Sequence, residues 1–216
     1  FESLKVNTTG AENTTLGTLS LRSATTASYN TAVGACALCS QTTGISNSAL
    51  GYLALSASTT GTLNTALGMN SMLGTTSGAN NVAVGHNSLR CNTTASNNTA
   101  IGLESLCANT TGDQNVAVGV VALTSNTTGT ENTAIGRFAM NSNTTGCYNT
   151  AVGKAALCTN TTAKCNTAIG MNALKSNTDG AVGVAVGYSA LVSNTTGGAN
   201  VAIGARALDT NTTGDN

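Results

Sequence analysis

The chain repeats itself every 17 residues along its whole printed length, without an insertion or a deletion. Each repeat contains one glycine at a fixed place, called here the anchor glycine; the twelve are Gly17, Gly34, Gly51, Gly68, Gly85, Gly102, Gly119, Gly136, Gly153, Gly170, Gly187 and Gly204. A repeat this short cannot bury an apolar face alone, so it must stack on identical neighbours. The repeat predicts an all-β fold, a parallel β-solenoid or β-roll of about twelve 17-residue coils. Residues 1–216 are expected to form a single array, a fragment of a longer one, because both ends stop inside a repeat without a polar cap.

Charge and composition narrow the classes of partner. Lysine plus arginine equals aspartate plus glutamate at eight each, and only 7% of residues are charged, which argues against nucleic acid binding. The chain has no proline, as continuously hydrogen-bonded strands require. It has no apolar stretch of the roughly 18 to 20 residues that a membrane span needs, so no membrane span is expected.

Two apolar ranks are predicted to form the core. The residue before the anchor glycine is always Val, Ile or Leu, and the residue two positions earlier is mostly Thr or Val, as at Thr31 and Val33. These alternate residues share one face of a strand, and we expect that face to point inward. The second rank holds only Leu or Met at thirteen equivalent positions from Leu4 to Leu208.

The residue between the two supposedly inward strand positions is alanine in eleven of twelve repeats. These alanines are Ala32, Ala49, Ala66, Ala83, Ala100, Ala117, Ala134, Ala151, Ala168, Ala185 and Ala202, with Thr15 as the departure. On this assignment they would form an exposed apolar stripe. Such a stripe predicts self-association of the chain, in a lateral or end-to-end assembly. The alternative is that alanine is present only because it fits a tight coil.

Asparagine and threonine occupy further fixed positions. Asparagine fills eleven of twelve equivalent places from Asn13 to Asn200, with Gly183 as the exception, and predicts an amide ladder. A threonine rank runs without interruption from Thr8 to Thr212. The glycine that closes each Asn-Thr-Thr-Gly segment suits a turn with positive φ.

Five variable positions in each repeat are predicted to face outward. They hold fifteen of the sixteen charged residues and all six aromatic residues. Among them, Tyr52, Phe138 and Tyr188 are the candidate contacts with a cell-surface or glycan receptor.

The seven cysteines do not recur at a fixed spacing, so they are not a metal-binding series. Two pairs are separated by one repeat minus or plus one residue and are candidate disulfides between adjacent coils: Cys91 with Cys107, and Cys147 with Cys165. Cys36 and Cys39 could pair only if the coil bends there, and Cys158 would be left over. The alternative is that the cysteines are free surface residues.

No constellation typical of catalysis or metal binding is present. His86 has no carboxylate or cysteine near it in the repeat, and Glu2 and Glu104 lie in distant coils. Calcium-binding β-rolls carry aspartate in every turn, whereas Asp113 and Asp215 alone occupy that region here. We therefore expect no enzymatic activity, no metal and no cofactor.

Asn-x-Thr sequons arise from the repeat itself, for example at Asn92, Asn109, Asn126, Asn143 and Asn194. They would carry a dense sugar coat if the host glycosylates the chain.

The repeat resembles a known family of sequences. The segment Asn132-Thr133-Ala134-Ile135-Gly136, followed by Ala139-Met140 and Asn143-Thr144-Thr145-Gly146, is similar to repeats of phage and large-virus tail-fibre proteins, often found ahead of a self-cleaving endosialidase-type chaperone domain. It is more loosely similar to the head repeats of YadA-like trimeric adhesins, which have a shorter period. The resemblance implies a trimeric shaft or head of a surface fibre.

Two functions are therefore expected from different classes. The first is a non-catalytic structural or adhesive segment of an extracellular, cell-surface or virion-surface fibre, acting as a rigid shaft or a surface-presenting rod. The second is an ice-binding β-solenoid that uses the threonine rank from Thr8 to Thr212. Against the second, that rank lies in the turn-like Asn-Thr-Thr-Gly segment, and the typical strand reads Thr-Ala-Val, where two threonines flanking an inward residue would be expected.

Overall fold

The computed structural model describes residues 1–215. The chain divides into two compact units, Phe1–Thr111 and Gly112–Asn216. Within the described residues each unit is built from three-residue strands joined by turns, with no helix. The first unit contains β1 (Thr14–Leu16), β2 (Thr31–Val33), β3 (Ser48–Leu50), β4 (Thr65–Leu67), β5 (Val82–Val84) and β6 (Thr99–Ile101). The second contains β7 (Val116–Val118), β8 (Thr133–Ile135), β9 (Thr150–Val152), β10 (Thr167–Ile169), β11 (Val184–Val186) and β12 (Val201–Ile203).

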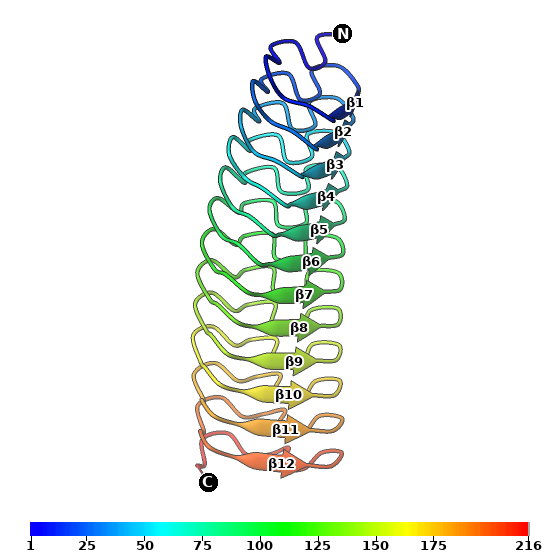
Figure 1. Ribbon diagram of the computed structural model, residues 1–216. Coiled ribbons are helices and arrows are strands. Elements are labelled where there is room, and N and C mark those ends of the chain that lie inside the picture. The colour runs from blue at the N-terminus through cyan, green and yellow to red at the C-terminus, as the bar shows by residue number, and fades with distance from the viewer. Residues whose placement is uncertain (216) are drawn as a thin grey trace. The chain divides into compact units, whose positions relative to one another are not determined.

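Within each unit, strands that follow one another in sequence pair in parallel. The partners are always equivalent residues of successive repeats: Ala32 lies opposite Ala49 where β2 pairs with β3, and Ala134 lies opposite Ala151 where β8 pairs with β9. Figure 1 shows the strands of each unit on one side of the coils, with the rest of every coil returning as irregular turns. The predicted parallel β-solenoid of 17-residue coils is confirmed.

The prediction of which strand face is inward was wrong. The strand alanines, from Ala32 to Ala202 as named above, are at most 2% exposed, so they line the core and form no surface stripe. Their neighbours on either side face outward: in β3, Ser48 and Leu50 are exposed while Ala49 is 1% exposed. The alternative, that alanine fits a tight coil, is the arrangement found.

The coil interior is too thin for a larger side chain on the strand. The third residue after the anchor glycine approaches the strand from the opposite wall, as shown by Ser71, whose hydroxyl donates to the Ala83 carbonyl at 3.1 Å. Thr15, at the alanine position of β1, fits because its Oγ1 accepts a 2.6 Å hydrogen bond from Ser3. The predicted leucine rank does face inward, and its members from Leu21 to Leu191 are at most 1% exposed.

Buried asparagine side chains form hydrogen bonds with backbone groups of neighbouring coils. In the predicted ladder, Asn64 donates from its backbone N–H and from Nδ2 to Asn47 Oδ1, at 3.0 and 3.2 Å, and its Nδ2 also reaches the Gly78 carbonyl at 2.8 Å. Its own Oδ1 accepts the same two bonds from Asn81. The amide ladder is therefore confirmed, and it joins successive coils on the side of the strand.

A second amide ladder was not anticipated. It is formed by the asparagine of each Asn-Thr-Thr-Gly segment; Asn143 donates to Asn126 Oδ1 at 2.8 Å and to the Gly146 carbonyl at 3.0 Å. In the first unit this second ladder is interrupted by Ala24, Gln41, Ser58 and Thr75, which take the place of asparagine. Asn7 Oδ1, Gln41 Oε1 and Ser58 Oγ are buried there without a hydrogen-bond partner.

Much of the turn backbone lies in the left-handed region. The anchor glycines have φ between 124° and 141°, and a Cβ on Gly34 would come within 2.5 Å of the Gly51 carbonyl oxygen. Bulky residues also adopt positive φ, as do Tyr29 (60°), Cys36 (58°) and Leu38 (52°), and the same places do so in nearly every coil. The glycine closing Asn-Thr-Thr-Gly does not, as Gly129 shows; a Cβ there would instead overlap the Asn126 amide oxygen.

Candidate functional site: the outward faces of the coils

The outward residues of the strands form an uncharged and largely aliphatic surface on each unit. We call this surface the strand face: the first and last residue of each strand, namely Thr14, Leu16, Thr31, Val33, Ser48, Leu50, Thr65, Leu67, Val82, Val84, Thr99 and Ile101 in the first unit and Val116, Val118, Thr133, Ile135, Thr150, Val152, Thr167, Ile169, Val184, Val186, Val201 and Ile203 in the second. It carries no charge. Its aliphatic members remain accessible: Leu50 is 48% exposed, Ile101 39% and Ile135 39%. A continuous uncharged apolar face of this kind is characteristic of a contact surface.

The three aromatic candidates do not form one site. Tyr52 belongs to the first unit and is 55% exposed. In the second unit, Tyr188 is 46% exposed, whereas Phe138 is half-buried under the guanidinium of Arg137, whose carbon lies 4.5 Å from the ring centroid. The two tyrosines are thus isolated surface rings, and the Phe138 ring is already occupied by a cation.

Neither predicted inter-coil disulfide is formed, although each pair lies on adjacent coils. The Cys91 backbone N–H donates to the Cys107 carbonyl at 2.9 Å, but both thiols are free. Burial, with smaller contributions from Cys91 and Glu104, raises the pKa of the Cys107 thiol to about 11. The thiolate that oxidation requires is therefore scarce at neutral pH.

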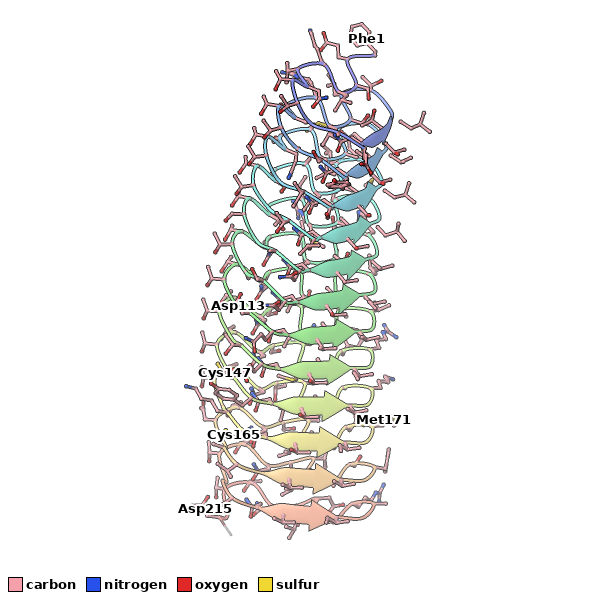
Figure 2. All side chains as sticks on the ribbon, in the orientation of Figure 1. Phe1, Asp113, Cys147, Cys165, Met171 and Asp215 are labelled. Carbon is pink, nitrogen blue, oxygen red and sulfur yellow. A yellow bond between two sulfur atoms is a disulfide. The ribbon has the colours of Figure 1, made fainter. Side chains whose placement is uncertain are left out.

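Cys147 and Cys165 are also free, and both lie on the side of the second unit away from Met171 (Figure 2). The Cys147 sulfur is engaged locally, since it accepts from the Thr130 N–H at 3.4 Å and donates to the Thr145 carbonyl at 3.3 Å. Cys158, the predicted leftover, is free and half-buried, and burial raises its pKa.

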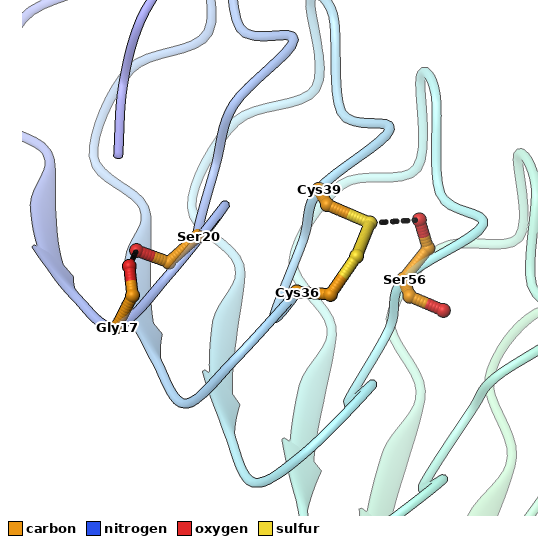
Figure 3. Close-up of a disulfide and its surroundings, with 5 residues drawn as sticks. All are labelled: Gly17, Ser20, Cys36, Cys39 and Ser56. Atoms are coloured by element: carbon orange, nitrogen blue, oxygen red, sulfur yellow. Dashed lines mark hydrogen bonds between the residues drawn. A yellow bond between two sulfur atoms is a disulfide. The ribbon is translucent and has the colours of Figure 1, made fainter. Parts of the chain in front are cut away.

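Cys36 and Cys39 form the disulfide found among residues 1–215 (Figure 3). They occupy the second and fifth places after Gly34, and their Cα atoms are 4.8 Å apart. The turn brings these two places together in other coils too: Glu2 and Lys5 hold them near the start of the chain and form a 2.6 Å ion pair. The Glu2–Lys5 spacing was the sequence signal that could have found the bridge.

A small hollow lies beside this disulfide. It has a volume of about 160 Å³ and is lined by Leu19, Arg22, Ser23, Cys36, Cys39 and Ser40. Arg22 holds the fifth place after Gly17 and so the same place as Cys39, one coil earlier.

The sequon asparagines are not surface groups. Asn92, Asn109, Asn126 and Asn143 are fully buried, and Asn194 is 1% exposed, because these residues form the second amide ladder. A glycan on any of these amides is incompatible with the folded coil.

The threonine rank from Thr8 to Thr212 is engaged in the fold. Most of its hydroxyls donate to the backbone carbonyl of the equivalent threonine in the next coil, as Thr42 does to Thr59 at 3.0 Å and Thr144 to Thr161 at 3.1 Å. These hydroxyl protons are therefore not offered to a ligand.

The remaining candidates lie apart. His86 is half-buried at the first place after Gly85, and Asp215 Oδ1 accepts a 2.6 Å hydrogen bond from the Gly198 N–H. Across residues 1–215 no three His, Cys, Asp or Glu side chains gather in a way that could hold a metal ion. The same residues contain no helix of the length and hydropathy that crossing a membrane requires.

Comparison of the chain with protein-family models, with curated proteins and with solved structures gave no match.

Proposed function

We propose that the chain is a non-catalytic structural or adhesive segment of a surface fibre, extracellular or on a virion, in which copies of the chain associate laterally through the strand face. The observation that carries this proposal is the strand face itself. Its two outward ranks are uncharged and largely aliphatic, and the inward residue between them is alanine. The sequence predicted a lateral contact through the strand alanines, and we now assign that contact to the outward residues on either side of each alanine.

The recurring polar side chains are used within the fold, which supports a role as a scaffold. The asparagines of both amide ladders and the threonine rank make hydrogen bonds between coils, so the residues left for recognition are the variable turn residues. Among the exposed rings of that set, Tyr52 and Tyr188 are the proposed contacts with a cell-surface or glycan receptor. The resemblance to tail-fibre and adhesin repeats adds the expectation of a trimer.

The mass in solution, measured by light scattering after gel filtration, tests lateral association. The native chain is expected to be an oligomer. The double substitution Ile101→Lys with Ile135→Lys places a charge on the strand face of each unit and is expected to shift the mass to that of one chain.

A matched control keeps the chemistry of the change and moves its position. Met69→Lys with Met171→Lys replaces two exposed turn residues, 46% and 41% accessible, and should leave the oligomer intact. A monomeric native chain, or equal effects of the two double substitutions, would show that the strand face is not the contact.

The ice-binding alternative retains one observation in its favour. The strand face is regular and uncharged, and one of its ranks is rich in threonine, as at Thr31, Thr99 and Thr133. The rank first considered, from Thr8 to Thr212, donates its hydroxyl protons to the fold. Thermal hysteresis measured on the purified chain decides between the two functions: clear hysteresis that is lost in Thr99→Lys with Thr133→Lys would favour ice binding over the fibre.

A further inference from the structure

The Cys36–Cys39 bridge does not hold the coil together. It closes a loop within one turn, and unbridged turns have the same backbone: φ is 58° at Cys36 and 57° at Leu53, its equivalent in the next coil. The ladder to the previous coil is the same as well, since the Cys36 N–H donates to Thr18 at 2.9 Å and the Leu53 N–H to Ala35 at 3.1 Å. Breaking the bridge therefore leaves the turn fixed by the same hydrogen bonds as its neighbours.

A hydrogen-bond acceptor for the reduced Cys39 thiol is already in place. The Ser56 carbonyl oxygen accepts the Ser40 N–H at 3.1 Å and lies 3.6 Å from Cys39 Sγ (Figure 3). A carbonyl oxygen has two lone pairs, so a Cys39 thiol can donate to the second one once the bridge is open.

The hollow beside the bridge gives small molecules access to the disulfide, and its lining favours negatively charged ones. Arg22 is the charged residue in its lining, and both cysteines line it too. A guanidinium is a bidentate partner for a carboxylate, and a positive charge beside a sulfur favours the thiolate that leaves during exchange.

We propose that Cys36–Cys39 is a reversible thiol–disulfide exchange site for small thiols that carry a carboxylate, with Arg22 as the residue that binds the carboxylate. In the first step the small thiolate attacks Cys36 Sγ, a mixed disulfide forms, and Cys39 leaves as a thiolate that takes a proton from water. In the second step another molecule of the thiol attacks the small-molecule sulfur of the mixed disulfide, releasing Cys36. The two thiols lose two electrons and become a disulfide, and the two cysteines gain them.

The test is the rate at which the bridge opens with thiols of different charge. The probes are 3-mercaptopropionate, 2-mercaptoethanol and cysteamine, with rates expressed per thiolate. Opening is followed by differential alkylation and peptide mass spectrometry. Trypsin cuts after Arg22 and after Arg90, so the peptide between them contains Cys36 and Cys39 and no other cysteine. Circular dichroism reports whether the chain stays folded.

In the native chain the anionic thiol is expected to react about threefold to tenfold faster than the neutral one, and the cationic one more slowly, as expected for one exposed charge near the reacting sulfur. Arg22→Gln should abolish this order. Lys175→Gln is the matched control, because Lys175 is also an exposed cation at the fifth place after its anchor glycine, and its replacement keeps the cleavage sites at Arg22 and Arg90.

Three results would overturn the proposal. The first is equal rates for the three thiols in the native chain. The second is an unchanged order of rates in Arg22→Gln. The third is a bridge that opens only when the chain unfolds, or that alkylation shows to be absent before any thiol is added.

Discussion

Val182 shows that the coil holds a single residue in a backbone conformation that its side chain disfavours. Its φ is 61°, its side chain is 61% exposed, and its N–H donates to the Lys164 carbonyl at 3.1 Å. A β-branched residue is disfavoured in this left-handed conformation, whereas asparagine adopts it readily. Asn80 and Asn97 occupy the same place in other coils, with φ of 57° and 61°.

Val182→Asn is therefore expected to stabilise the chain by about 1 kcal/mol. Thermal and denaturant unfolding measure the change. Val201→Asn is the control, since Val201 is 62% exposed but lies in β12, where a β-branched residue is favoured and asparagine should destabilise. Destabilisation by both substitutions would contradict the role assigned to the left-handed backbone.

Two half-buried thiols give the fold a pH dependence in alkaline solution. The pKa of Cys107 is raised to about 11 from an ordinary value of 9.0, and the pKa of Cys158 is raised as well, in both cases chiefly by burial. The folded chain then holds these protons more tightly than the unfolded chain. Stability contributed by the protonated thiols is complete below about pH 9 and is lost as the pH rises towards 11.

The double substitution Cys107→Ala with Cys158→Ala should flatten this part of the stability curve. Denaturant midpoints measured from about pH 8 to about pH 11, which is from about one unit below to about two units above the thiol's ordinary pKa, provide the comparison with the native chain. If both curves fall in parallel, lysine and tyrosine titration accounts for the loss and the thiols do not.

At the scale of a structural element, the strand-side amide ladder has one gap. Gly183 has no side chain to accept from Asn200, while its own N–H still donates to Asn166 Oδ1 at 2.8 Å. A Cβ on Gly183 would meet Asn166 Oδ1 at 3.2 Å and Leu174 Cδ1 at 3.6 Å, so there is room for one with a small adjustment.

Gly183→Asn is expected to close the gap and to stabilise the second unit by about 1 to 2 kcal/mol, through new bonds to Asn200, Asn166 and the Gly197 carbonyl. Gly183→Ala fills the same space without an amide and separates the hydrogen bonds from the loss of glycine flexibility. Unfolding midpoints that are equal for the two variants would mean that the ladder bonds contribute nothing at this place.

The geometry of the turn after the anchor glycine leads to a second prediction, for an engineered disulfide. Cys158 holds the fifth place after Gly153, and Ala155 holds the second, the same two places as Cys39 and Cys36. Ala155→Cys should therefore form a bridge with Cys158 under air. Alkylation of the unreduced chain followed by mass spectrometry detects it, and Lys154→Cys, one residue earlier, should leave two alkylated thiols instead.

The sequence was sufficient to predict the 17-residue coil but not to predict which face of the strand points inward. The register of Ala32 on Ala49 and the burial of the leucine rank follow from the period alone. The inward strand face was assigned by size, Val33 over Ala32, and this was wrong because the opposite wall leaves room for little more than a methyl group. The useful signal was invariance: the buried place is nearly always alanine, while its outward neighbours vary among Thr, Ser, Val, Ile and Leu.

The Cys36–Cys39 disulfide was expected only if the coil bends at that point, for a related reason. Linear spacing of about one repeat suggested bridges between coils, yet the bridge lies inside one turn. Residues such as Cys36 and Leu38 adopt positive φ, and no propensity assigns that conformation to cysteine or leucine. The fold of the turn is imposed by hydrogen bonds to neighbouring coils, which a single repeat does not reveal.

At the scale of the whole molecule, stability should be additive over coils. Removing Tyr52–Gly68 deletes one complete repeat of 17 residues and joins Gly51 to Met69, so every remaining residue keeps its place in a coil. This variant should retain the β circular dichroism of the native chain and unfold cooperatively with a modest loss of stability. Removing only Tyr52–Thr60 leaves an incomplete coil and should abolish that cooperative transition; similar melts for the two deletions would refute additivity by coil.

The interrupted turn ladder of the first unit has a consequence for where the chain opens. From Ala24 to Thr75 the second amide ladder lacks its asparagines, and three buried polar atoms have no partner, whereas asparagine continues without a break from Asn126 to Asn211 in the second unit. Buried polar atoms without partners lower the free energy needed to separate coils locally. Water, and then a protease, should enter first among the early coils, so that a damaged molecule is trimmed from the first unit while the second remains folded.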